Sequence, residues 1–135
     1  MDFSGVLIRR GNIFHSCDFK DIDHCKYFVI IGEDLNNYVG FFFINSNINI
    51  SIQKEIKFFN MQMPIKRHFY EFLNYDSFID AHAISTIPKD KLKNQISKGL
   101  TKFKGSLTQE DEKLLLESLR CSDLYSEYEK TSFFK

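Results

Sequence analysis

An acidic residue and a histidine lie two positions apart in a stretch that the sequence predicts to be a β strand. Asp80 and His82 belong to Asp76–Ile84, where Phe78 would share their face and Ile79 would project to the other. Side chains two apart on one strand face are roughly 6.5–7 Å apart. A carboxylate and an imidazole at that separation could flank a small reacting group without bonding each other. The alternative is that His82 is a solvated strand histidine and Asp80 a turn or edge charge.

Four residues near the start of the chain have side chains that bind zinc in other proteins: His15, Cys17, His24 and Cys25. They could meet if the loop between them folded back. Their spacing differs from that of zinc knuckles, however, and the adjacent His24 and Cys25 would point to opposite sides of a strand. We therefore predict no metal and no other cofactor, and a folded loop that exposes His24 near a cleft.

The three cysteines, Cys17, Cys25 and Cys121, form an odd set without disulfide-like spacing. Arg9 and Arg10 follow the first apolar residues instead of preceding an apolar segment, which does not fit a signal peptide. No apolar run approaches the ~20 residues of a membrane span. We expect a soluble protein of the reducing cytoplasm that has no membrane partner.

Two short apolar runs, Tyr27–Ile31 and Tyr38–Ile44, are the elements best placed to carry a site. They are rich in β-branched and aromatic residues and too short for buried helices, and the connector 32–37 has turn chemistry. We interpret them as the two central strands of a hairpin. Lys26 enters the first strand and Asn45-Ser46 follows the second, so antiparallel pairing would bring these residues to one end of the hairpin.

Other strands are predicted on both sides of this hairpin. Gly11 precedes a first strand over 12–17, and alternating isoleucines over 48–52 predict a half-buried strand or an extended excursion. A further strand would run up to Pro64, because proline cannot donate to a ladder. Residues 66–75 are interpreted as a short helical turn or connector, with three side chains facing inward: Phe69, Phe72 and Leu73.

Helices are predicted mainly in the last third of the chain. Residues 85–88 form a short strand that passes into a helix at Pro88, with an apolar stripe at Leu92, Ile96 and Leu100. Residues 102–107 are predicted to be extended. Thr108 is the expected N-cap of the clearest helix, whose first turn is acidic. The aromatic and acidic tail 121–135 would pack on the domain or on a partner.

The net charge of zero over 135 residues argues against bulk electrostatic binding to nucleic acid. The distribution is uneven, since Lys89–Lys104 carries a net +5 and Ser106–Glu129 a net −5. These segments are either the solvated faces of neighbouring elements or, for the first, a basic rim that could position phosphates. No phosphate-binding glycine loop, Gly-x-Ser-x-Gly elbow or His-Glu-x-x-His pattern occurs.

The order of elements predicts one domain over residues 1–135, with a core of about 11–120. Strands crowd the first 87 residues and helices follow, which makes the fold class mainly β with C-terminal α (α+β). The expected architecture is a small SH3-like barrel of about five to seven antiparallel strands, or a strongly bent sheet, with one or two helices after residue 88.

This order resembles that of the PemK/MazF-like toxins of toxin–antitoxin systems, which are SH3-like barrels that cleave RNA. The resemblance covers about residues 11–120 and is carried by the order of five segments: Gly11–Phe14, His24–Ile31, Phe41–Ser46, Ser77–Leu92 and Lys104–Thr108. The chain departs from the family where its Arg-Pro becomes Lys26-Tyr27 and its Thr-Ser becomes Asn45-Ser46. The family's arginine and aspartate on the late strand are matched here by Asp80 and His82.

The resemblance implies a metal-independent endoribonuclease that cleaves single-stranded RNA by using the 2′-hydroxyl, and a homodimer with a cognate antitoxin as its partner. In that reading His82 transfers protons with Asp80 as its partner or as the base. Lys26 would stabilise the phosphate, and His24 would be a second proton-transfer residue. Substrate would be held by three further side chains: Asn45, Ser46 and, through base stacking, Tyr27.

The alternative function is a catalytically inactive domain of the same fold that binds a protein or peptide. The departures at Lys26, Asn45 and Asp80 favour this alternative, since lysine lacks the bidentate phosphate geometry of arginine. Loss of RNA cleavage and of toxicity would distinguish it from the ribonuclease.

Overall fold

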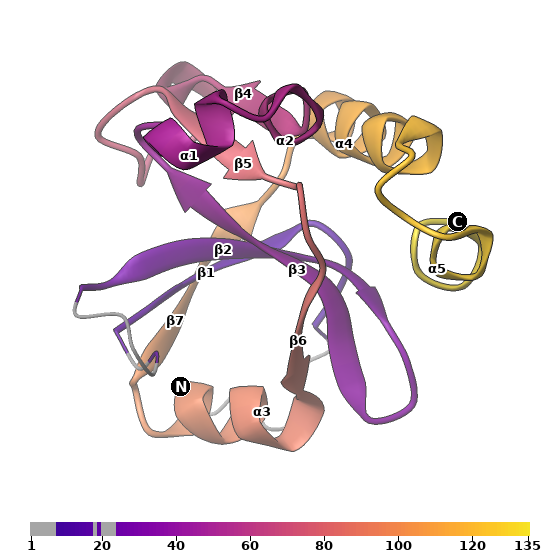
Figure 1. Cartoon of the computed structure of the whole chain (residues 1–135). Coiled ribbons are helices and arrows are strands. Elements are labelled where there is room, and N and C mark those ends of the chain that lie inside the picture. Colours follow the sequence, from indigo (N-terminus) through magenta and orange to yellow (C-terminus); the bar gives the residue numbers. More distant parts are fainter. Residues whose placement is uncertain (1–7, 18, 20–23) are drawn as a thin grey trace.

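The computed structural model describes residues 8–17, 19 and 24–135, which form a mainly antiparallel sheet with helices packed on both faces (Figure 1). This confirms the α+β class. The described residues contain seven strands and five α helices: β1 (Asn12–Ser16), β2 (Lys26–Glu33), β3 (Asn37–Asn45), α1 (Ile50–Gln53), α2 (Ile56–Phe59), β4 (Gln62–Ile65), β5 (Ser77–Asp80), β6 (Ser85–Pro88), α3 (Lys89–Ser97), β7 (Thr101–Ser106), α4 (Gln109–Cys121) and α5 (Glu127–Phe133).

The predicted hairpin is the centre of the sheet, whose strand order is β4-β5-β3-β2-β1-β7. β3 pairs with β2 on one side, and its other side is shared by β5 near Asn45 and by β6 near Tyr38. Within the β3–β6 ladder the register shifts at Gly40, whose φ of +69° is readily adopted only by glycine. The sheet therefore bends at this point and follows two directions.

The sheet does not close, so the predicted barrel is wrong and the strongly bent sheet is what forms. Among the described strands, β4 and β7 remain as two open edges. The predicted strand over 48–52 is also wrong, because residues 50–59 fold into the single-turn helices α1 and α2. Asn49 caps α1 by accepting a hydrogen bond from the Ser51 amide at 2.8 Å. This segment therefore supplies no strand that could help to close the sheet.

Each face of the sheet has its own apolar core, and we name the two after the helices that cover them (Figure 1). The α3 core contains Phe28 and Ile30 of β2, and the α4 core contains Val29 and Ile31 of the same strand. β2 is buried on both faces, which explains why its sequence is an unbroken apolar run instead of an alternating one.

The helix signals after residue 88 are largely confirmed. Thr108 caps α4 by accepting a hydrogen bond from the Asp111 amide at 3.1 Å, and Pro88 precedes α3. The apolar stripe of α3 ends at Ile96, because Gly99 at φ +75° terminates the helix and leaves Leu100 exposed. No helix in the described part of the chain is long and apolar enough to cross a membrane.

Two expectations for the later chain are wrong. Phe69 is 62% exposed, because the 3₁₀ turn Arg67–Phe69 turns its ring away from the sheet. A third helix, α5, follows α3 and α4, and it begins with a capping box between Ser126 and Glu129. Such a box, a serine with a glutamate three residues later, is a sequence signal for a helix start, and it explains why the aromatic and acidic tail is helical.

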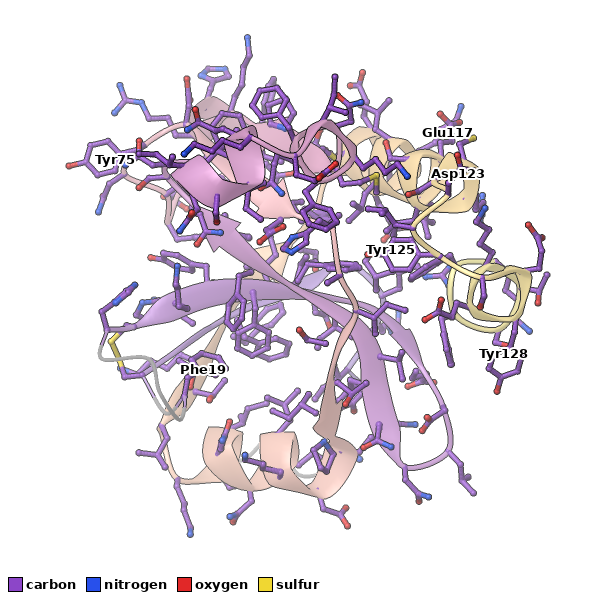
Figure 2. All side chains as sticks on the ribbon, in the orientation of Figure 1. Phe19, Tyr75, Glu117, Asp123, Tyr125 and Tyr128 are labelled. Atoms are coloured by element: carbon purple, nitrogen blue, oxygen red, sulfur yellow. A yellow bond between two sulfur atoms is a disulfide. The ribbon has the colours of Figure 1, made fainter. Side chains whose placement is uncertain are left out.

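The tail from α5 onward packs on the sheet. Phe134 is fully buried in the α4 core, with its ring 5.2 Å from that of Tyr125. Tyr125 points inward and donates its hydroxyl to the carbonyl of Ala81 at 2.6 Å, whereas Tyr128 points into solvent (Figure 2). Arg10 donates to the carbonyl of Phe133 at 3.2 Å, which ties the tail to the first described segment.

A buried tyrosine links the start of α4 to the loop after β4. The hydroxyl of Tyr70 donates to the Asp111 carboxylate and accepts the Thr108 amide at 3.1 Å. Burial, followed by the hydrogen bond to Asp111, raises the pKa of Tyr70 to about 12. The neutral phenol is therefore the form that stabilises the fold.

We expect Tyr70→Phe to lower the free energy of unfolding by about 2 kcal/mol near pH 8, since a hydrogen bond to a charged group is lost. A raised tyrosine pKa stabilises the fold fully below the unfolded pKa of about 10, and this contribution, at most about 2.7 kcal/mol, is lost as the pH rises to about 12. The difference between wild type and variant should shrink over that range in urea unfolding. A constant difference would contradict this assignment, and Tyr75→Phe, at an exposed tyrosine, is the control.

Candidate functional site

The neighbouring ends of β2 and β3 hold the first two candidate residues side by side. Lys26 is the first residue of β2 and Asn45 the last of β3, and the pairing of Tyr27 with Ile44 places them together. The Lys26 ammonium donates a hydrogen bond to the side-chain carbonyl of Asn45 and lies 5.9 Å from the centre of the Phe43 ring. An ammonium has three donors, so two remain for a ligand.

Asp80 reaches the same place from β5. That strand pairs with the end of β3 through Ile79–Ile44, and Asp80 follows at the end of β5. Lys26, Asn45 and Asp80 line one depression of about 520 Å³, together with residues of β4 and of the segment 47–52. Burial lowers the pKa of Lys26, while the negative charge of Asp80 acts in the opposite direction. A partly desolvated ammonium of this kind attracts a further anion, such as a phosphate.

His82 and Asp80 hydrogen-bond to each other, which corrects the expectation that they would flank a group without bonding. The His82 Nδ1 pairs with the Asp80 Oδ1, and the His82 amide lies 3.4 Å from the same oxygen. The physical reason is that β5 ends at Asp80. The chain turns there, so the alternation of a strand no longer separates the two side chains.

The contacts of this pair fix its orientation. Gln62 Nε2 donates to Asp80 Oδ1 at 2.7 Å, and the His82 ring packs against Phe58 of α2 at 4.9 Å between centroids. About a quarter of the His82 side chain (25%) is exposed. A carboxylate that accepts Nδ1–H selects the tautomer in which Nε2 is free to take a proton. Asp80 and His82 therefore have the arrangement of an oriented general base.

A second depression of about 370 Å³ adjoins the first. Its lining includes the remaining candidates, His24, Tyr27 and Ser46, and it shares Lys26 and Asn45 with the first depression. Lys26 and Asn45 thus form the ridge between the two. Every candidate except His82 lines one of these depressions, and His82 is joined to them through Asp80.

Tyr27 is more enclosed than a free stacking platform. Its ring lies 4.4 Å from that of His15 and 5.2 Å from that of Phe72, and its hydroxyl donates to the Phe72 carbonyl at 3.2 Å. Tyr75, also on the lining of the second depression, points outward and is 69% exposed (Figure 2). Tyr75 therefore offers a ring to a ligand more openly than Tyr27 does.

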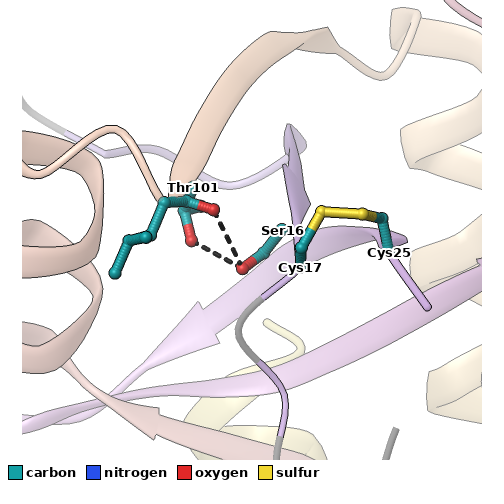
Figure 3. The surroundings of a disulfide bond; sticks show 5 residues. Ser16, Cys17, Cys25 and Thr101 are labelled. Atoms are coloured by element: carbon teal, nitrogen blue, oxygen red, sulfur yellow. Dashed lines mark hydrogen bonds between the residues drawn. A yellow bond between two sulfur atoms is a disulfide. The ribbon is translucent and has the colours of Figure 1, made fainter. Parts of the chain in front are cut away.

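Cys17 and Cys25 form a disulfide, so the expectation of unpaired cysteines is wrong (Figure 3). β1 and β2 pair up to Ser16 and Lys26, which places the next residue of each strand face to face. Two cysteines eight residues apart can therefore meet across a strand pair. In the neighbouring β1–β7 ladder, Thr101 donates its hydroxyl to that of Ser16, its paired residue, at 2.8 Å (Figure 3).

The same disulfide involves both cysteines of the possible zinc site, Cys17 and Cys25. Sulfur atoms in a disulfide are not the thiolates that zinc requires. Within the described residues, no group of three or more His, Cys, Asp or Glu side chains is placed to hold a metal ion.

Gln62 and Tyr75 have places at the site that the sequence did not indicate. Gln62 lies opposite Asp80 in the β4–β5 ladder. The hydrogen bond from Gln62 to Asp80 joins residues 18 positions apart, and no local sequence pattern predicts such a pairing. Tyr75 lies in a loop whose position depends on the same two strands.

The comparisons with known proteins identify no relatives: no family model matches the sequence, and no curated protein is significantly similar to it.

Proposed function

We propose that this protein is a metal-independent endoribonuclease that cleaves single-stranded RNA, and that it is the toxin of a toxin–antitoxin system. The observation that supports this most is the meeting of Lys26, Asn45 and the hydrogen-bonded Asp80–His82 pair at one depression. RNA cleavage through the 2′-hydroxyl uses a base for the 2′-hydroxyl proton, an acid for the leaving 5′ oxygen and a cation that stabilises the phosphate. The proposal rests on this site, because the open sheet departs from the barrel that the family resemblance implies.

The proposed reaction begins with proton transfer. Nε2 of His82 takes the proton of the 2′-hydroxyl, and Asp80 stabilises the imidazolium through Nδ1–H. The 2′ oxygen then attacks the phosphorus, the bond to the 5′ oxygen breaks, and a 2′,3′-cyclic phosphate forms. Lys26 stabilises the charge on the non-bridging oxygens, and Asn45 and Ser46 hold the substrate. His24, across the Lys26 ridge, supplies a proton to the leaving 5′ oxygen.

Removal of Lys26 tests the proposal. The wild type should cleave a labelled 20-nucleotide RNA in the presence of EDTA and leave 2′,3′-cyclic phosphate ends. Lys26→Ala should lower the rate about 10²–10³-fold, because a charge stabiliser of the transition state is lost. Lys66→Ala, at an exposed lysine, is the control.

Two outcomes would contradict this proposal. One is an absence of cleavage by purified wild type on any RNA. The other is equal cleavage, and equal growth arrest on expression, by wild type and Lys26→Ala.

The partners and the compartment belong to the same proposal. A cognate antitoxin would be encoded in the neighbouring reading frame, the protein would form a homodimer, and both would act in the cytoplasm, where messenger RNA is found. Co-expression with the neighbouring gene should relieve growth arrest, and light scattering should give twice the mass of 16.0 kDa. The Cys17–Cys25 disulfide is unusual for a cytoplasmic protein.

The second candidate function is a module that binds a protein or peptide without catalysis. It is favoured by the exposed apolar side chains of the single-turn helices beside the site, since Ile50 is 69% and Ile56 70% exposed. A pull-down partner lost in Ile50→Ser/Ile56→Ser, together with wild type that does not cleave RNA, would support this function over the ribonuclease.

A further inference from the structure

A row of side chains leads from the second depression to the β7 edge of the sheet. Tyr27 pairs with His15 on β1, and His15 pairs with Lys102 on β7. Directly paired residues point to the same face of a sheet, so the three lie on one face. Two spacings between strands separate Tyr27 from Lys102, about 10 Å in all. Together with Lys104 we call these residues the edge strip.

Lys104 belongs to the strip because of an irregularity in the β1–β7 ladder. Phe14 pairs with Phe103 and Ile13 with Gly105, which leaves Lys104 as the extra residue of a bulge. A bulge changes the direction of a side chain. After burial, the charge of Lys104 is the largest influence that lowers the pKa of His15, ahead of that of Lys102. Both ammonium groups are therefore near enough to His15 for their charges to act on it.

The lowered pKa keeps His15 neutral at physiological pH. A neutral imidazole packed 4.4 Å from the Tyr27 ring is a flat aromatic surface, and both lysines beside it are exposed. Aromatic rings interleaved with cations are the usual binding surface for single-stranded nucleic acid. The bases stack on the rings, and the phosphates form ion pairs with the cations.

The sheet lies between two groups of lysines that follow each other in sequence: those of α3, and Lys102 and Lys104 of the edge strip. The lysines of α3 belong to the helix that covers the α3 core. The row from Lys102 to Tyr27 continues to Ile44 and Ile79, which belong to the α4 core. The two groups of lysines thus lie on opposite faces of the sheet. The edge strip meets the candidate site at the strand ends, where Tyr27 lines the second depression beside Lys26.

We infer that the edge strip binds the nucleotides that flank the cleaved bond of single-stranded RNA. One base stacks on His15 beside Tyr27, and the following phosphates pair with Lys102 and Lys104. This inference rests on the proposed function, and it extends the binding surface from the ridge at Lys26 to the edge strand.

The test measures binding of a fluorescein-labelled 12-nucleotide 2′-O-methyl RNA, which cannot be cleaved through the 2′-hydroxyl, by anisotropy at several salt concentrations. Each phosphate contact on a single strand contributes about 0.7 to the slope of log K against log salt. Lys102→Gln/Lys104→Gln should therefore reduce the slope by about 1.4. Lys91→Gln/Lys98→Gln, in α3 and at its C-cap, removes the same charge from the opposite face and should leave the slope unchanged.

The stacking part is tested at His15. His15→Ala should weaken binding about 5- to 150-fold, the usual loss for one stacked base, and His15→Phe should restore it. A loss in His15→Phe equal to that in His15→Ala would overturn the stacking assignment.

The inference and the proposed function fail in different ways. If wild type binds and cleaves RNA but the two double variants have the same slope, the edge strip is not a binding surface and the ribonuclease stands. If wild type neither binds the 12-nucleotide RNA nor cleaves a natural one, both are overturned.

Discussion

Replacement of His82 by alanine is expected to lower the rate of RNA cleavage by about 10²–10⁴-fold, the usual contribution of a general base. His82 is oriented by Asp80, which is itself held by Gln62 at 2.7 Å. Asp80→Asn should cause a comparable loss, up to about 10⁴-fold, because an amide N–H that donates to Nδ1 selects the tautomer in which Nε2 carries the proton and cannot act as a base. The measurement is single-turnover cleavage of a labelled RNA, with growth arrest on expression as a second readout.

Two controls make the His82 result specific. His68→Ala removes an exposed histidine whose ring lies 5.0 Å from that of its exposed neighbour Phe69, and it should cleave like wild type. His82→Gln keeps most of the packing against Phe58 and should lose activity while its melting temperature stays close to that of wild type. Cleavage by His82→Gln at the wild-type rate would remove His82 from the mechanism.

The largest expected loss of stability comes from Phe134→Ala, at about 3–5 kcal/mol. The ring is fully buried against Tyr125, and a side chain on Gly40 would meet it at 3.0 Å. Its removal leaves a cavity where the tail closes the α4 core. Since small domains have only about 5–15 kcal/mol of stability, much of the chain's stability would be lost.

Urea unfolding followed by circular dichroism measures this loss. Phe69→Ala deletes the same side chain at a position that is 62% exposed, and it should change the free energy of unfolding by less than about 0.5 kcal/mol. Equal midpoints for the two variants would mean that the tail does not contribute to the core.

Local signals predicted the elements whose stability is local. The hairpin of β2 and β3 has apolar runs on both sides of an Asx turn, in which Asp34 accepts the amides of Asn36 and Asn37. Helix α4 has its N-cap at Thr108 and its acidic first turn. In each case the residues that cause the structure are neighbours in sequence.

The predictions that are wrong concern segments whose structure depends on pairing between residues distant in sequence. The isoleucines at 48, 50 and 52 alternate like a strand, but none of the described strands pairs with them, and a cap at Asn49 starts a helical turn instead. The disulfide depends on the ladder between β1 and β2. The bond between Asp80 and His82 depends on where β5 ends, which is set by pairing with β4 and β3.

For the candidate site, the sequence predicted that strand ends would gather Lys26 and Asn45, since this follows from antiparallel pairing alone. It could not predict that Gln62 would hold Asp80, or that the edge strand β7 would lie two strands from Tyr27. Both depend on the strand order of the whole sheet.

The position of β7 beside β1 also has a consequence for the timing of folding. Contacts such as Asn12 to Ser106 and Ser16 to Thr101 join residues 94 and 85 positions apart. At a synthesis rate of about 5–20 residues per second, the residues of β7 are made about 4–19 s after the β1 residues with which they pair. The α4 core is completed later still, because it includes Phe134 near the end of the sequence. The candidate site residues, all before residue 83, therefore emerge from the ribosome well before the α4 core is complete.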